Sequence, residues 1–176
     1  MCEDTDIKIA SEKPSEDIKR NAMNSGTDMD TESIHRGRAL GEKIAELYMG
    51  ALLDQGPGAG EGSEEMLLQR QILLSFAALS GFERFCKNSD AATAARSTFF
   101  EVIKNRYKAY YGGATDNGAL SFYYLAFRRG SEVERRIGQT FAMLCSHDGD
   151  PVYQELGEAL YCWFSSVVKK TAKEIL

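Results

Sequence analysis

The sequence predicts an all-α fold, a single compact bundle of about six helices preceded by a disordered N-terminal tail. Apolar residues recur with the helical period of 3.6 in every long segment, and no segment shows the alternation or turn residues of a β-hairpin. A chain of 176 residues with 43% apolar side chains is long and apolar enough for one hydrophobic core. We therefore expect residues 1–32 to form the tail and residues 33–176 to form one helical bundle domain.

The tail is predicted from composition. Residues 1–33 contain nine acidic and four basic side chains, whereas residues 34–176 contain seventeen of each. Large apolar side chains are too few in the tail to offset the entropy lost on ordering it. The charge-balanced remainder favours no class of charged partner.

The first helix is expected from Ser33 to the glycine-rich stretch "DQGPGAGEGS". Within it, Gly37, Gly41 and Ala45 recur every four residues. Because a glycine inside a helix costs about 1 kcal/mol relative to alanine, this small-residue face predicts the close approach of another helix. A surface that merely tolerates glycine is the alternative interpretation.

The later helices are predicted from their start signals and apolar rows. The second helix is apolar on nearly every side and should lie at the centre of the bundle. The predicted starts are Ser63, the group 88–90, Asp116, Ser131 in an S-x-x-E capping box, and Asp150 ahead of Pro151. The third helix is expected to continue to Gly112 and Gly113, and the fourth to end near Gly130.

Residues 105–130 combine seven aromatic with four basic side chains, which suits either a bundle interior with charged edges or a nucleic-acid surface. Helical spacing turns most of these aromatic residues toward the core, and cations in a last helical turn complement the helix dipole. However, residues 84–136 hold ten basic and five acidic side chains, so a positive nucleic-acid-binding face is kept as the alternative. Its candidate residues are Lys104, Lys108, Tyr111, Arg128, Arg129, Arg135 and Arg136.

Phe122 and Leu125 form a second candidate site. Both lie off the apolar stripe that contains Leu120, so the fourth helix is either covered on two sides or exposes an interface. The functional interpretation is binding to another protein or to a second copy of the chain.

No motif indicates a specific chemistry. The stretch "HDGD" at 147–150 suggests a helical metal hydrolase, but His35 is the only other histidine, so loop and capping roles are favoured. The stretch "GPGAGEGS" lacks the lysine of a phosphate-binding loop. We predict no cofactor, and the missing motifs favour a non-enzyme without deciding the question.

The spacing of the cysteines and the composition of the N-terminus predict the cellular compartment. Four widely spaced cysteines suit free thiols in a reducing compartment, and no secretion signal or membrane-spanning apolar run is present. We therefore expect a cytoplasmic, bacterial-type protein that acts as a protein-interaction or self-associating module and does not bind membranes. A nucleic-acid-binding or regulatory module is the alternative, and a metal-dependent helical enzyme is the third hypothesis.

Overall fold

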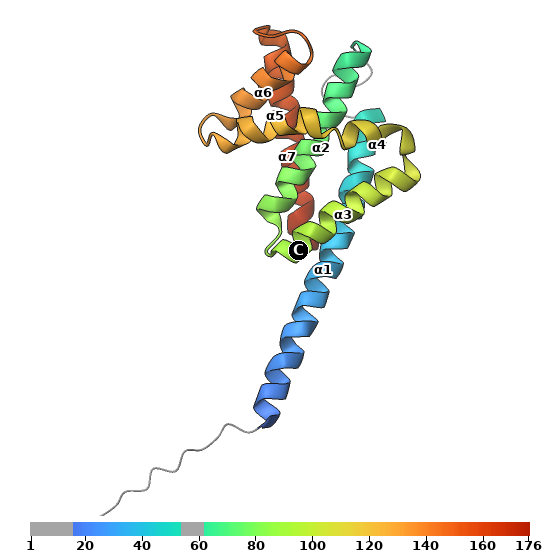
Figure 1. Cartoon of the computed structure of the whole chain (residues 1–176), viewed down its shortest axis with the longest axis vertical. Coiled ribbons are helices and arrows are strands. Elements are labelled where there is room, and N and C mark those ends of the chain that lie inside the picture. Colours follow the sequence, from blue (N-terminus) through green and yellow to red (C-terminus); the bar gives the residue numbers. More distant parts are fainter. Residues whose placement is uncertain (1–15, 54–61) are drawn as a thin grey trace, which may run out of the picture.

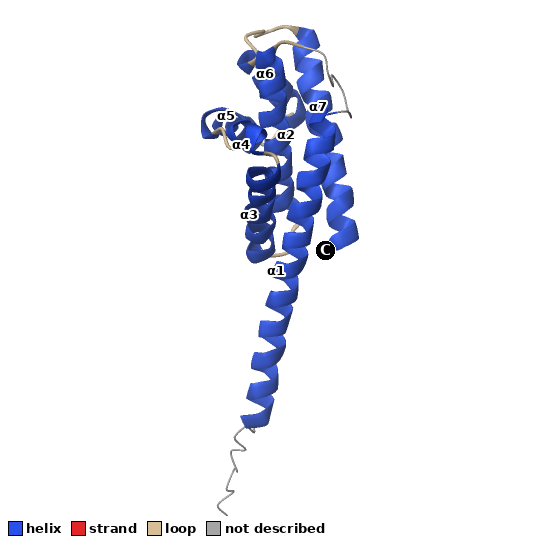
Figure 2. Cartoon of the chain, turned by 90° about the vertical axis from the view of Figure 1, so that its right-hand side faces the viewer, coloured by secondary structure: helices blue, strands red, loops and turns tan. Residues whose placement is uncertain are grey.

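The structure is a computed structural model that describes the backbone of residues 16–53 and 62–176, with side chains from residue 30 onward. No strand occurs in these two ranges, and the predicted all-α fold is confirmed. The helices are α1 (Glu16–Leu53), α2 (Glu64–Phe85), α3 (Ser89–Arg106), α4 (Lys108–Ala114), α5 (Asn117–Arg128), α6 (Val133–Leu144) and α7 (Pro151–Ile175). Long helices α1, α2 and α7 follow the long axis of the molecule, and α5 crosses them (Figures 1 and 2).

The start of α1 differs from the prediction. This helix begins at Glu16 rather than near Ser33, and its first turns extend beyond the bundle (Figure 1). No proline interrupts residues 16–33, and helix propagation is favourable once a helix has nucleated. Residues 1–15 of the predicted tail lie outside the described residues.

The region predicted as the third helix is divided into α3 and α4, which makes seven described helices instead of six. The backbone leaves the helical conformation at Tyr107, where φ is −134° and ψ is 48°. This break lets α4 turn onto α2, where the buried Ser75 hydroxyl donates a 2.8 Å hydrogen bond to the carbonyl of Ala114. Gly113 fits here because a Cβ would lie 2.5 Å from Oε1 of Gln71.

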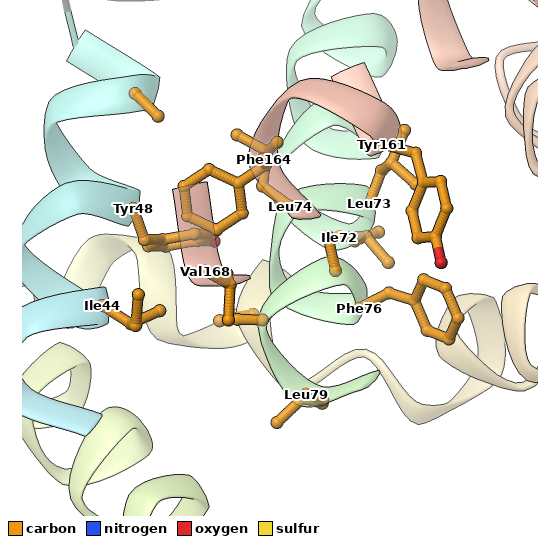
Figure 3. Packing of buried hydrophobic residues seen from close by; sticks show 14 of the residues in the cluster. Ile44, Tyr48, Ile72, Leu73, Leu74, Phe76, Leu79, Tyr161, Phe164 and Val168 are labelled. Atoms are coloured by element: carbon orange, nitrogen blue, oxygen red, sulfur yellow. The ribbon is translucent and has the colours of Figure 1, made fainter. Parts of the chain in front are cut away.

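Helix α2 forms the centre of the bundle, as its all-round apolar sequence predicts. Every residue from 72 to 82 is buried. Phe76 lies 5.6 Å from the ring centroid of Tyr123 and 6.0 Å from that of Tyr161. Figure 3 shows Phe76 and Tyr161 facing each other on one side of α2, with Tyr48 and Phe164 on the other side.

The small-residue face of α1 packs directly on α3. A Cβ at Gly37 would lie 2.4 Å from the backbone oxygen of Ala91, and a Cβ at Gly41 would lie 2.2 Å from that of Ala95. Real Cβ atoms essentially never approach other atoms this closely, so only glycine permits the contact. The predicted close approach of another helix is therefore confirmed.

Four of the five starts predicted for the later helices carry a side-chain cap. Backbone amides donate to the side-chain oxygens of these residues at 2.7–3.2 Å. The four caps are Ser63, Asn88, Asp116 and Asp150.

The prediction of a capping box at Ser131 is wrong. Helix α6 begins at Val133, and Glu132 occupies the cap position with a left-handed φ of 50° and no side-chain cap. Gly130, with φ of 80°, makes the turn so tight that the helix starts later than the motif predicts. The Ser131 hydroxyl instead accepts a 3.3 Å hydrogen bond from Nη2 of Arg136.

Candidate functional site

A groove of about 380 Å³ lies between α5 and α6. Its apolar part contains three large side chains that face solvent: Phe122 is 48% exposed, Leu125 59% and Met143 42%. Three grooves of larger volume lie along α2–α3, along α1–α3 and between α2 and the α5–α6 turn, and none of the exposed large apolar residues lines them. The α5–α6 groove is therefore the strongest candidate for binding an apolar surface.

The exposure of Phe122 and Leu125 follows from the way α5 is anchored. Leu120 and Tyr123 are buried against α2, where Tyr123 stacks on Phe76. Side chains on the opposite side of α5 must then point away from the bundle. The described residues therefore do not cover α5 on both sides, and Phe122 and Leu125 face solvent.

Met143 completes the apolar surface and was not predicted. It lies in the last turn of α6, off the buried row formed by Ile137 and Phe141. The same offset test that identified Phe122 would have identified it from the sequence.

The two ends of the groove carry opposite charge. Arg129 and Arg136 line the end beside the α5–α6 turn, and Asp148 lines the groove beyond the end of α6. Near Asp148, the Ser146 hydroxyl donates a 2.9 Å hydrogen bond to Oε1 of Glu65, which places a second carboxylate in the same region.

The arginines at the turn differ in how they are paired. Arg135 forms an exposed 3.5 Å ion pair with Glu132. Within the described ranges, no carboxylate forms an ion pair with Arg128, Arg129 or Arg136. The buried Nη1 of Arg136 also has no hydrogen-bond acceptor among these residues. The two arginines that line this end of the groove, Arg129 and Arg136, therefore have no ion-pair partner among the described residues.

The predicted nucleic-acid face is divided into two groups. Lys104 and Lys108 belong to the α3–α4 junction, where Nζ of Lys104 lies 6.0 Å from the ring centroid of Tyr111. The four arginines belong to the α5–α6 turn, on the opposite side of the bundle (Figure 1). The structure therefore brings Lys104 and Tyr111 together, but it does not join them to the arginines.

The stretch at 147–150 has structural roles. The ring of His147 stacks on Tyr153 with centroids 3.8 Å apart, and Asp150 caps α7 by accepting a hydrogen bond from the amide of Val152. Across the part of the chain that the structure describes, no three histidine, cysteine, aspartate or glutamate side chains are grouped to hold a metal ion.

Cys145 should be protected from alkylation by the folded structure. Burial, reinforced by the Glu65 carboxylate, raises the pKa of this thiol from 9.0 to about 12. In a Cys2→Ser background, we expect the exposed Cys162 to be alkylated in the native protein and Cys145 only after unfolding. Mass spectrometry of iodoacetamide-treated protein measures both, and equal rates at the two cysteines would contradict the burial of Cys145.

The same shift predicts how stability depends on pH. Because the unfolded thiol ionises near 9 and the folded thiol near 12, the contribution of Cys145 is fully present below pH 9. It is lost as the pH rises from 9 to about 12. Cys145→Ala should therefore reduce the fall in unfolding free energy over this alkaline range, as measured by urea denaturation at several pH values.

Within the described helices, none is both long enough and apolar enough to cross a membrane. Comparisons with models of protein families, with curated proteins and with solved structures found no match.

Proposed function

We propose that this protein is a non-enzymatic interaction module and that another protein chain docks in the α5–α6 groove. One observation carries the proposal: of the six large apolar side chains exposed in the described residues, three line this groove. They are Phe122, Leu125 and Met143. A contiguous apolar surface loses unfavourable contact with water when a partner covers it.

The chemistry around the apolar residues also suits a protein partner. Aromatic residues, methionine and arginine are enriched at the centres of protein interfaces, and the groove offers Phe122, Met143, Arg129 and Arg136. The free thiols of the three described cysteines suit a reducing compartment, and we therefore place this interaction in the cytoplasm.

Negative charges introduced into the apolar part of the groove should abolish partner capture without unfolding the protein. We expect a pull-down with the full chain from a lysate of the source organism to recover proteins that the Phe122→Asp, Leu125→Asp double variant does not recover. Both side chains are about half exposed, so the variant should remain folded in circular dichroism. Quantitative mass spectrometry of the recovered proteins measures the loss.

The matched control is Val152→Asp, which introduces the same charge at an apolar residue of α7 that is 69% exposed and does not line the groove. This control should recover the same proteins as the unmodified chain. Equal loss in the control and in the double variant would contradict the proposal. Recovery that disappears after nuclease treatment would instead favour nucleic-acid binding through Arg128, Arg129 and Arg136, with the steep salt dependence of phosphate contacts.

A further inference from the structure

We infer that the groove binds a second copy of this chain, with the two copies antiparallel across a two-fold axis. This inference rests on the proposed function, because it requires the α5–α6 groove to be a docking site. The order of charges along the groove identifies the partner as a second copy of the chain.

The order of charges follows from the sequence positions of the lining residues. Helix α5 runs into the turn at 129–132 and α6 runs back from it, so distance from the turn increases along both helices. Arg129 lies in the turn, Arg136 and Leu125 each lie about one helical turn along α6 and α5, Phe122 and Met143 lie beyond them, and Asp148 follows the end of α6. The groove is therefore cationic at one end, apolar in the middle and acidic at the other end.

Such a surface is complementary to itself when one copy is reversed. In a two-fold dimer the same patch on both chains meets, and each residue contact occurs twice. Antiparallel packing places the Arg129 and Arg136 side chains of each copy over Asp148 of the other. The apolar central parts of the two grooves then bury each other. The two arginines then gain the carboxylate partners that they lack among the described residues of their own chain.

A partner with one sign of charge would fit less well. A uniformly acidic helix would pair with the two arginines but would face Asp148 with like charge. A uniformly basic helix would have the opposite mismatch. The exposed apolar part consists of three side chains, Phe122, Leu125 and Met143, so we expect a weak dimer with a micromolar dissociation constant.

Charge-swap variants of the full chain test the symmetry directly. We expect sedimentation velocity over the micromolar range to show a species of twice the 19.5 kDa chain mass. Variant one carries Arg129→Glu and Arg136→Glu, and variant two carries Asp148→Arg. Each variant alone should dimerise at least about tenfold more weakly than the unmodified chain, because like charges then meet at both ends.

Mixing the two variants should restore association. In the mixed dimer, the new glutamates of variant one face the new arginine of variant two, and the unmodified ends face each other. A chain with all three substitutions should also dimerise, because its charge order is simply reversed. A single partner protein of fixed charge order would reject that chain.

The outcomes separate this inference from the proposed function. An unmodified chain that stays monomeric throughout the concentration range overturns the second-copy inference, and so does a mixture that associates no better than either variant alone. Neither result affects the pull-down, which tests the groove against any protein. If the monomer still recovers proteins through Phe122 and Leu125, the proposed function stands with a different partner.

Discussion

Replacing Gly41 with alanine is expected to destabilise the protein, although alanine favours a helix over glycine. The added Cβ would lie 2.2 Å from the backbone oxygen of Ala95, and backbone atoms cannot move aside as a flexible side chain can. Helices α1 and α3 must then separate, which opens gaps between Ala45, Phe99 and their neighbours. We expect a loss of about 2–4 kcal/mol in the free energy of unfolding, measured by urea denaturation.

Gly50 provides a control on the same helix. A Cβ at Gly50 would meet nothing within 4 Å, so Gly50→Ala should stabilise the protein by about 0.5–1 kcal/mol through helix propensity alone. Opposite signs for Gly41→Ala and Gly50→Ala are the signature of close packing between α1 and α3. Stabilisation by both substitutions would show that the two helices do not make this contact.

Truncation of Phe76 should destabilise the protein even more than Gly41→Ala does. The Phe76 side chain is fully buried, and its ring lies 5.0 Å from the centroid of Tyr124 and 5.9 Å from that of Phe127. Phe76→Ala removes the ring around which the aromatic residues of α5 pack and leaves a cavity between α2 and α5. We expect a loss of about 3–5 kcal/mol in the free energy of unfolding.

Phe122→Ala provides the matched comparison, because it removes the same side chain from a position that is 48% exposed. In dilute protein we expect a loss below about 1 kcal/mol. Comparable losses for the two variants would contradict the assignment of Phe76 to the core and Phe122 to the surface. Thermal unfolding followed by circular dichroism gives an independent reading of the same difference.

The features that the sequence predicted correctly depend on local spacing. Helical periodicity separates the buried Leu120 and Tyr123 from the exposed Phe122 and Leu125 without reference to any other helix. Likewise, the repeat of small residues every four positions pointed to the close approach of another helix at Gly41, and the structure decides between this and a surface that merely tolerates glycine.

The features that the sequence did not predict depend on tertiary structure. The break at Tyr107 carries no proline or glycine, and it follows from the packing of α4 on α2. The capping box at Ser131 is a valid local motif that the tight turn at Gly130 displaces.

The division of the basic residues is another tertiary effect. Lys104 and Arg129 belong to one basic stretch in the sequence, but α5 runs away from the α3–α4 junction toward the turn that contains Arg129 (Figure 1). A net charge counted along the chain cannot show this, because it contains no information on the direction of a helix.

Photo-crosslinking from within the groove tests the central claim most directly. A benzoylphenylalanine in place of Leu125, in the full chain expressed in the source organism, should form an adduct of twice the 19.5 kDa chain mass on irradiation. The same residue in place of the more exposed Val152 should form none. An adduct with a different protein would retain the groove as a docking site but exclude the second copy. Equal adducts from both positions, or none from either, would contradict the assignment of the α5–α6 groove as a protein-binding surface.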